Sequence, residues 1–332
     1  MAGRYKRFAS KSSGIIPCAE LMRYIVTGSA GFLGANLVLR LLDAGHEVVG
    51  LDNYHSGSRA NTAMLLERPG FTFVEHDVVK PYDIPCDVLC NLACPASPPH
   101  YQKDPVYTLR ISVHGTLHAL ENAERHKARV LHASTSEIYG DPLVHPQPEA
   151  YLGNVNSTGP RACYDEGKRA AETLCADFTR LGRVDARLVR IFNTYGPHMR
   201  GDDGRVVTNF LLQAMSGKPL TVYGAGQQTR SFCYVDDLIE GFIRVLALPE
   251  NQGPINLGNP NEFTMLQLAE AVQHLVGSSL PLHFEPLPVD DPKQRRPDIA
   301  KARRLLGGWE PKVQLVEGLG KTLAYFRAQP LA

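Results

Sequence analysis

The sequence predicts an α/β protein with a doubly wound parallel sheet and a smaller C-terminal substrate-binding domain. A glycine-rich turn lies between an apolar and an amphipathic segment just after residue 23. Apolar segments of strand length then alternate with helical ones up to residue 192, beyond which Gly, Pro and charged residues become frequent. Because alternating strands and helices form parallel sheets with right-handed crossovers, we expect a sheet of the Rossmann type.

The individual elements follow in order along the chain. The first strand is expected at 24–26 and the turn at 27–34, and apolar residues from Leu37 to Leu42 recur at helical spacing. Further strands are expected at residues 47–52, 71–75, 87–92, 130–133 and 186–192. Residues 232–248 and a short strand at 254–257 are expected to return to this sheet, and amphipathic helices at 264–276 and 316–326. The predicted domains are 23–192 plus about 231–260, and about 193–230 plus 261–332.

The composition excludes several classes of function. Lys and Arg number 35 and Asp and Glu 34, so the chain lacks the net charge that gathers nucleic acid or anionic lipid. The odd count of seven cysteines, without a CxxC pair, predicts reduced thiols and a cytoplasmic protein. Cys86, Cys90 and Cys94 recur every fourth residue, but an apolar setting predicts a buried strand and no metal. Residues 1–22 are expected to be a disordered tail without a signal or membrane segment.

The turn TGSAGFLG, residues 27–34, predicts a dinucleotide site. Its glycines allow a tight turn and bring backbone N–H groups against a pyrophosphate at a helix N-terminus. Asp52, at the end of the next strand, is placed to accept hydrogen bonds from ribose hydroxyls and to repel a 2′-phosphate, which favours NAD over NADP. The candidate cofactor-binding residues are Gly28, Ala30, Gly31, Phe32, Leu33, Gly34, Asp52, Asn53, Asp77, Val78, Leu92, Tyr164 and Lys168.

A pair of reactive side chains is expected on the helix at 163–178. Tyr164 and Lys168 are four residues apart and therefore share one face of that helix. A phenol with an ordinary pKa of about 10 is a poor base at neutral pH, but a fixed cation nearby favours the phenolate. The segment STSE, residues 134–137, ends the fifth strand at the sheet edge where open α/β sheets bind ligands. Hydroxyls and a carboxylate should therefore meet the base there.

Together, TGxxGFLG, STSE and YxxxK resemble the extended short-chain dehydrogenase/reductases that modify nucleotide sugars, the NAD-dependent epimerase/dehydratase family. The resemblance runs from about residue 23 to residue 326. Within this family the sequence is most similar to the UDP-glucuronate decarboxylases, which make UDP-xylose. The similar segments are residues 91–101, 159–169, 203–207 and 228–232.

The resemblance implies a role for each matched residue. Tyr164 would take the proton of the sugar 4-hydroxyl, Lys168 would hold the nicotinamide ribose and tune Tyr164, and Thr135 would hydrogen-bond the reacting oxygen. NAD would take up a hydride and return it, so the reaction is redox-neutral. Glu137 would position a water or the sugar ring, and arginines would bind the diphosphate. The candidate catalytic residues are Tyr164, Lys168, Thr135, Glu137, Ser136 and Arg295, and the candidate substrate residues Pro98, Tyr101, Asn193, Arg205, Tyr223, Arg230 and Arg295.

Ser136 distinguishes between related reactions. The 4,6-dehydratases of the family carry an Asp-Glu pair here because loss of water needs a general acid. Ser136 therefore favours decarboxylation of a UDP-sugar acid, with a nucleotide-sugar 4-epimerase or 4,6-dehydratase as the alternative. A nonenzymatic NAD-binding regulator is the remote alternative. Departures from the family wording at Cys94, Ser112 and residues 198–202 leave open which sugar acid is accepted. As in the relatives, a homodimer is expected through helices around 107–124 and 164–180.

Overall fold

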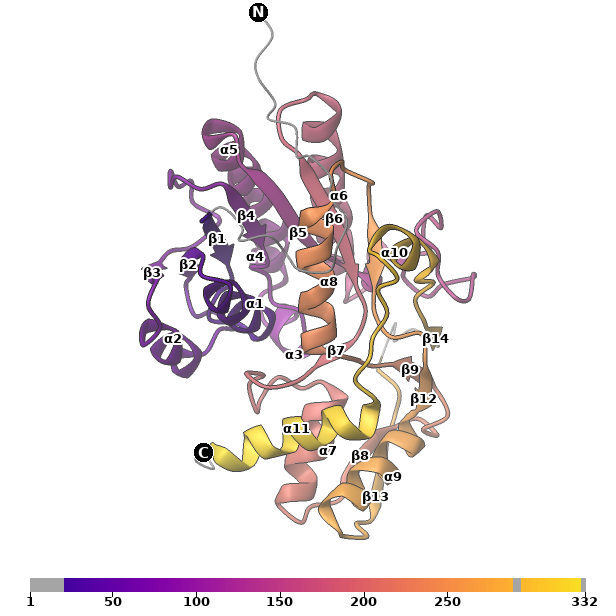
Figure 1. The fold of residues 1–332 in the computed structure, drawn as a ribbon. Coiled ribbons are helices and arrows are strands. Elements are labelled where there is room, and N and C mark those ends of the chain that lie inside the picture. Colours follow the sequence, from indigo (N-terminus) through magenta and orange to yellow (C-terminus); the bar gives the residue numbers. More distant parts are fainter. Residues whose placement is uncertain (1–20, 289–293, 330–332) are drawn as a thin grey trace, which may run out of the picture.

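The structure, a computed structural model, describes residues 21–288 and 294–329. The predicted tail, residues 1–22, therefore lies almost entirely outside the described residues. Figure 1 shows a sheet with helices on both faces and, at its lower end, a second group of elements that includes α7, α9 and α11. This layered arrangement agrees with the α/β class predicted from the sequence.

The main sheet has seven strands, and every pair of neighbours is parallel. The order β3-β2-β1-β4-β5-β6-β11 reverses direction between β1 and β4, which is the switch point where doubly wound sheets bind ligands. Each strand predicted from an apolar segment is present within a few residues of its expected bounds. The strands are β1 Arg23–Thr27, β2 Glu47–Asp52, β3 Phe71–Glu75, β4 Val88–Asn91, β5 Arg129–Thr135, β6 Ala186–Ile191 and β11 Ile255–Leu257.

The two faces of the sheet follow from side-chain alternation along the strands. Tyr24 and Val26 of β1 pack into the cluster that includes α1 and α8, whereas Ile25 packs into the cluster formed with α5 and α6. The helices of this part are α1 Phe32–Asp43, α2 Arg59–Leu66, α3 Pro98–Tyr101, α4 Pro105–Arg110, the π-helical turn η1 Ile111–Gly115, α5 Thr116–His126, the 3₁₀ turn η2 Ser136–Tyr139, α6 Ala162–Arg180 and α8 Val235–Ala247.

The second group of elements forms small sheets of its own. β8 pairs with β13, β10 with β7, and β9 lies between β12 and β14. The strands are β7 Thr194–Tyr195, β8 Leu220–Tyr223, β9 Thr229–Ser231, β10 Cys233–Tyr234, β12 Glu262–Thr264, β13 Leu282–Glu285 and β14 Gln294–Arg295. The helices are α7 Val206–Met215, α9 Met265–Val276 and α11 Leu315–Ala328, whereas α10 Ala300–Leu305 packs against β11 of the main sheet. The segment 232–248 does return to the main sheet, chiefly as the covering helix α8.

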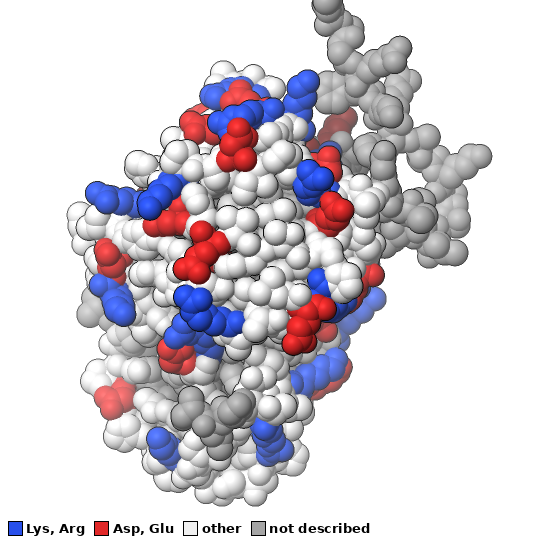
Figure 2. Space-filling model, turned by 90° about the vertical axis from the view of Figure 1, so that its left-hand side faces the viewer, with Lys and Arg blue, Asp and Glu red and all other residues white. Residues whose placement is uncertain are grey.

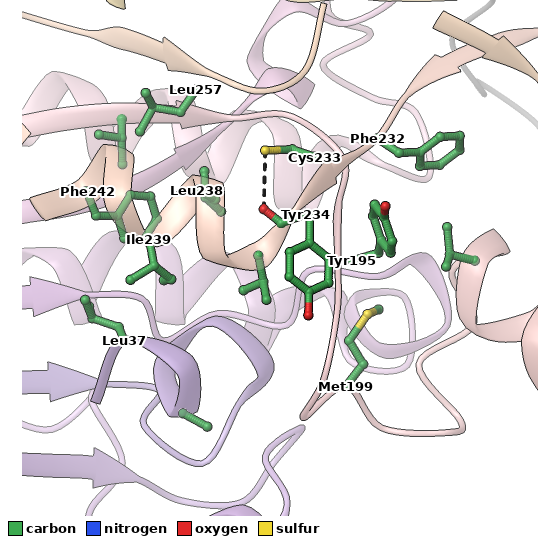
Figure 3. Packing of buried hydrophobic residues seen from close by; sticks show 14 of the residues in the cluster. Leu37, Tyr195, Met199, Phe232, Cys233, Tyr234, Leu238, Ile239, Phe242 and Leu257 are labelled. Atoms are coloured by element: carbon green, nitrogen blue, oxygen red, sulfur yellow. Dashed lines mark hydrogen bonds between the residues drawn. The ribbon is translucent and has the colours of Figure 1, made fainter. Parts of the chain in front are cut away.

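One hydrophobic cluster joins the two groups of elements. It runs from Leu37 of α1 through Phe242 of α8 to Tyr195 and Phe232, all of them almost completely buried (Figure 3). Burial of each such side chain contributes about 1.5–3 kcal/mol relative to exposure. The Tyr195 hydroxyl donates to the Leu315 carbonyl oxygen at 3.2 Å, which ties α11 to the same core.

The surface of the protein agrees with the near-zero net charge of the sequence. The face drawn in Figure 2 carries basic and acidic residues side by side. Among the described residues, none of the helices combines the length and hydrophobicity needed to span a bilayer. Cys86 and Cys90 are buried as expected, but Cys94 is only half-buried because β4 ends at Asn91 and the chain then turns toward a cavity.

Candidate active site

The glycine turn between β1 and α1 is held by close backbone contacts. Gly28 has a φ of 73°, in the left-handed region that favours glycine, and its N–H donates to the Leu51 carbonyl oxygen at 2.7 Å. A Cβ on Gly34 would lie 2.0 Å from the Gly28 carbonyl oxygen, and a Cβ on Gly28 would lie 2.9 Å from the Ala93 nitrogen. Both glycines are therefore required by the packing of the turn against α1 and the chain after β4.

A cavity opens in front of this turn. The first turn of α1 carries no acidic residue and no side-chain cap, so its partial positive charge remains available to an anion. This arrangement fits the pyrophosphate of a dinucleotide. Most of the predicted cofactor residues line this cavity, namely Gly28, Gly31, Phe32, Leu33, Gly34, Asp52, Asn53, Asp77, Val78 and Leu92.

Asp52 both lines the cavity and fixes the turn. One carboxylate oxygen accepts a hydrogen bond from the Ala30 N–H at 3.0 Å, and the other accepts one from the Tyr54 N–H at 2.7 Å. Burial raises the pKa of this carboxyl above its ordinary value, while the backbone donors oppose that rise. Ala30 itself is fully buried behind the turn, so the structure does not place it among the residues that line the cavity.

A second cavity holds the reactive residues. Its lining includes Thr135, Ser136, Glu137, Tyr164, Lys168 and Asn193. The two cavities share Leu33, Leu92, Cys94, Ala96 and Arg205, so they form one continuous groove along the carboxyl edge of the sheet. The structure thus brings the glycine turn, the STSE segment and the Tyr-Lys pair to one site. No three His, Cys, Asp or Glu side chains of the described ranges gather where they could hold a metal ion.

Tyr164 is more strongly buried than the sequence suggested. Its ring stacks on the Tyr101 ring, with centroids 5.1 Å apart and planes 5° from parallel. Burial raises the pKa of the Tyr164 phenol, and Cys94 and Glu137 add to that rise. The Lys168 ammonium donates to the Ala133 carbonyl oxygen at 2.7 Å and lies 5.9 Å from the Tyr164 ring centroid. Burial therefore opposes the lowering of the phenol pKa that was expected from Lys168, and the tuning of Tyr164 by Lys168 stays a prediction.

Glu137 is fixed by two arginines. Arg295 donates to both carboxylate oxygens, at 2.5 and 2.7 Å, and Arg161 donates to one of them at 2.7 Å. Burial alone would raise the pKa of Glu137, but Arg295 and Arg161 outweigh it and lower the pKa to about 2. Glu137 is therefore a carboxylate at neutral pH, and it is engaged on both oxygens.

Asp165 and Tyr101 bring two further polar groups to this cluster. One carboxyl oxygen of Asp165 and the Tyr101 hydroxyl are buried and find no hydrogen-bond partner among the described residues. Burial and the negative charge of Glu137 raise the pKa of Asp165 to about 7. Unpaired buried polar groups are costly, and both of these residues are buried outside the lining of the groove.

The remaining predicted substrate residues fall into two sets. Arg205 lines both cavities, and its Nε lies 3.1 Å from the Asp203 carboxylate. Pro98 and Tyr101 begin and end α3, close to the groove but outside its lining. Arg230 and Tyr223 also lie outside the lining, and the Tyr223 side chain is exposed at the end of β8.

β9 and β14 bring two arginines together. Arg230 and Arg295 are direct register partners in this parallel pair, although they are 65 positions apart in the sequence. Both guanidinium side chains are buried. With the buried Arg161 just before α6, they make up a set of three buried arginines, called the arginine wall below. Arg161 and Arg295 bond Glu137 directly, and none of the three is in the lining of the groove.

The match to a family model then decides the affiliation of the chain. Residues 24–258 match the NAD dependent epimerase/dehydratase family. The chain belongs to this family. The matched range covers all seven strands of the main sheet except the first residue of β1, and it includes the glycine turn, STSE and the Tyr-Lys pair.

Several members of the family are similar to this chain over most of its length. UDP-glucuronic acid decarboxylase 1 of Arabidopsis thaliana is 53% identical over 308 residues, which cover 92% of this chain and 70% of that protein. UDP-glucuronic acid decarboxylase 3 of the same plant is 52% identical over 303 residues, which cover 91% of this chain and 88% of that protein. The decarboxylase 1 of Xenopus tropicalis is 50% identical over 307 residues, which cover 92% of this chain and 72% of that protein.

Solved structures of family members have the same fold. A UDP-glucuronic acid 4-epimerase from Bacillus cereus, in complex with UDP-glucuronic acid and NAD, has a TM-score of 0.83 at 30% identity and covers 92% of this chain and 99% of its own. A UDP-glucose 4-epimerase from Thermotoga maritima with UDP-glucose has a TM-score of 0.84 at 26% identity, with the same coverage.

Two residues of the site were missed by sequence reasoning. Arg161 and Asp165 stand in the family-like segment 159–169, on either side of Tyr164, but neither had been assigned a role. The similarity of this segment to the decarboxylases was the signal in the sequence that could have identified them. Their importance becomes visible only when Arg295, brought in by β14, meets Glu137 beside them.

Proposed function

We propose that this protein is an NAD-dependent decarboxylase that converts UDP-glucuronate into UDP-xylose and carbon dioxide. The observation that carries the proposal is the state of the STSE segment. Ser136 has no acidic group, and Glu137 is a carboxylate bound on both oxygens by Arg161 and Arg295. Dehydration needs a general acid at this position, whereas loss of carbon dioxide does not. The decarboxylases that are 50–53% identical to this chain support the same reaction.

The chemistry balances without a metal or a second cofactor. When bound, NAD supplies an acceptor for the C4 hydride of the sugar and returns that hydride after carbon dioxide has left. The 4-ketone lies β to the C5 carboxylate, so the electrons of the breaking carbon–carbon bond move into an enolate. One proton taken up at C5 gives the 4-keto pentose, and return of the hydride to C4 and of the proton to its oxygen completes UDP-xylose. One proton is therefore consumed for each carbon dioxide released.

The residues of the groove would divide this work. Tyr164 holds the proton of the sugar 4-hydroxyl during oxidation and gives it back, and the Thr135 hydroxyl, which hydrogen-bonds Tyr164, orients that oxygen. Lys168 is held next to Tyr164 by the hydrogen bond that its ammonium donates to the Ala133 carbonyl oxygen. The arginine wall of Arg161, Arg230 and Arg295 supplies positive charge for the diphosphate and for the acidic sugar.

The proposal includes the organisation of the chain. We expect an NAD-binding domain over 23–192 plus about 231–260 and a nucleotide-sugar domain over the rest. A homodimer would form through α4, η1, α5 and α6, since α4 exposes the side chains of Val106 (63%) and Leu109 (41%). The six cysteines of the described residues are free thiols, which suits the reducing cytoplasm. Analytical ultracentrifugation of the wild type and of Val106→Asp tests the dimer.

The deciding experiment follows both products of one reaction. Purified protein incubated with UDP-glucuronate is expected to release carbon dioxide and UDP-pentose in equal amounts. Conversion to a UDP-hexuronate epimer without gas would instead support a 4-epimerase, which the likeness to the Bacillus cereus 4-epimerase makes the second candidate. Tyr164→Phe is the control and should lower turnover about 100-fold or more. Full turnover in that variant would remove Tyr164 from the mechanism.

A further inference from the structure

A segment of the second group of elements borders the cofactor cavity. This segment, residues 197–205 and called the strap below, connects β7 with α7. Its last residues, Asp203 and Arg205, line the cavity that holds the glycine turn. Its first half, residues 197–200, lies outside the cavity lining and has contacts of its own.

Two asparagines fasten the first half of the strap to the cofactor turn. The Asn36 side-chain nitrogen donates to the Phe32 carbonyl oxygen at 2.8 Å and to the Pro197 carbonyl oxygen at 3.0 Å. The Asn61 nitrogen is shared in the same way with the carbonyl oxygens of Ala30 and His198, both at 3.1 Å. Each amide thus uses both of its protons to join the turn region to the strap.

The strap is strained at the point where Asn61 holds it. His198 has a φ of 69°, an uncommon conformation for a residue with a side chain, which persists only where the surroundings fix it. Those surroundings are the Asn61 amide and the Tyr325 ring, whose centroid lies 5.0 Å from that of His198. Arg200 adds a third attachment, because its Nη1 donates to the Gly57 carbonyl oxygen at 3.2 Å.

The other end of the strap is seated on the opposite side of the cavity. Gly204 has a φ of 81°, and a Cβ there would lie 2.7 Å from Cγ of Pro99 in α3. The strap therefore reaches from the α1 and α2 side of the cavity to the α3 side, with attachments at both ends. Its last residues, Asp203 and Arg205, are the part of the strap that lines the cavity where a dinucleotide would lie.

We propose that Asn36 and Asn61 hold the strap closed over bound NAD and thereby keep the cofactor on the protein between turnovers. The inference rests on the proposed function, since that reaction returns the hydride to the sugar that supplied it. Release of reduced cofactor before the return would leave a keto sugar and an enzyme unable to start again. Residues that slow dissociation therefore serve this reaction more than they would serve an ordinary dehydrogenase.

The test compares NAD dissociation from the purified full-length protein and its variants. Asn61→Ala should release NAD about five- to tenfold faster, because one buried hydrogen bond to the strap is lost, and Asn36→Ala somewhat less. The readouts are the NAD content after gel filtration and the release rate when a scavenging dehydrogenase traps the free cofactor. Arg200→Ala, which removes a half-buried side chain at the surface, should give a two- to threefold increase and remains informative if Asn61→Ala folds poorly.

Asn122→Ala is the matched control. Asn122 is also fully buried, and its side chain bonds the backbone of Ile84 at 2.9 and 3.0 Å, but it lies outside the cavity and the strap. Its replacement should lower the melting temperature without changing NAD release. Unchanged release in folded Asn61→Ala and Arg200→Ala, or equally fast release in Asn122→Ala, would overturn the inference. Retained NAD without carbon dioxide production would overturn the decarboxylase proposal alone.

Discussion

The two ends of the groove are built by different kinds of interaction. At the cofactor end, backbone groups of Gly28, Gly31 and Gly34 shape the cavity within a single turn of chain. At the reactive end, the shape depends on side-chain charges, and Glu137 and Arg295 meet across 158 residues of sequence. The difference suggests that the cofactor end can be damaged by adding one carbon atom, whereas the reactive end is damaged by removing one charge.

The largest expected effect breaks the reactive end alone. Arg295→Met removes both hydrogen bonds that this arginine makes to Glu137, so turnover of UDP-glucuronate should fall about 100- to 1,000-fold. The NAD content should stay that of the wild type, because Arg295 does not line the cofactor cavity. Carbon dioxide release and bound NAD are measured on the same sample. Arg296→Met, which changes a more exposed neighbour, is the control, and an equal loss there would point to general damage.

The second prediction breaks the cofactor end. Gly34→Ala places a Cβ 2.0 Å from the Gly28 carbonyl oxygen, so the turn must shift, at a cost of about 1–3 kcal/mol or more. NAD binding should weaken about 10- to 100-fold, measured by isothermal titration of cofactor-free protein. Gly320→Ala serves as the comparison, because its Cβ would meet nothing closer than 3.9 Å. Wild-type affinity in Gly34→Ala would show that the turn is less rigid than its contacts indicate.

A third prediction concerns cofactor selectivity. Asp52→Asn removes a negative charge from the ribose end of the cavity, and the preference for NAD over NADP should drop about tenfold. The ratio of the two dissociation constants is the measurement, since a loss of turn stability alone would weaken both cofactors equally. Asp77→Asn, which also changes a carboxylate that lines the cavity, is the matched variant. A similar change in ratio there would assign the selectivity to overall charge.

The smallest expected effect is a pH dependence of stability that arises from Asp165 at the reactive end. Asp165 has a folded-state pKa of about 7 against an ordinary value of 3.8, so the folded protein binds a proton that the unfolded chain has lost. Its contribution to stability therefore falls as pH rises from about 4 to 7, by on the order of 1–3 kcal/mol. Asp165→Asn should match the wild type near pH 4 and melt at a higher temperature at pH 8. Parallel melting curves across this range would contradict the raised pKa.

The sequence sufficed for features that depend on local contacts. The strands, the glycine turn, and the shared face of Tyr164 and Lys168 all follow from spacings of a few residues, and the structure has them where they were predicted. The arginine wall could not be predicted in the same way. Its members come from a loop end, from β9 and from β14, and only tertiary packing brings them together.

The electrostatics of the reactive pair show a second limit. Spacing alone places Lys168 one helical turn from Tyr164, but it does not reveal that the ammonium bonds Ala133 or that Tyr101 covers the phenol ring. Burial of a titratable group is a property of the assembled core. The direction of the pKa shift of Tyr164 therefore required the structure.

The hydrophobic cluster shared by α1, α8 and Tyr195 bears on how the molecule unfolds. Because the same buried side chains stabilise both groups of elements, neither group can lose its packing while the other keeps it (Figure 3). A calorimetric scan should therefore show one cooperative transition, with equal calorimetric and van't Hoff enthalpies. A ligand bound at either end of the groove would then protect the whole chain against heat, including helices far from that ligand.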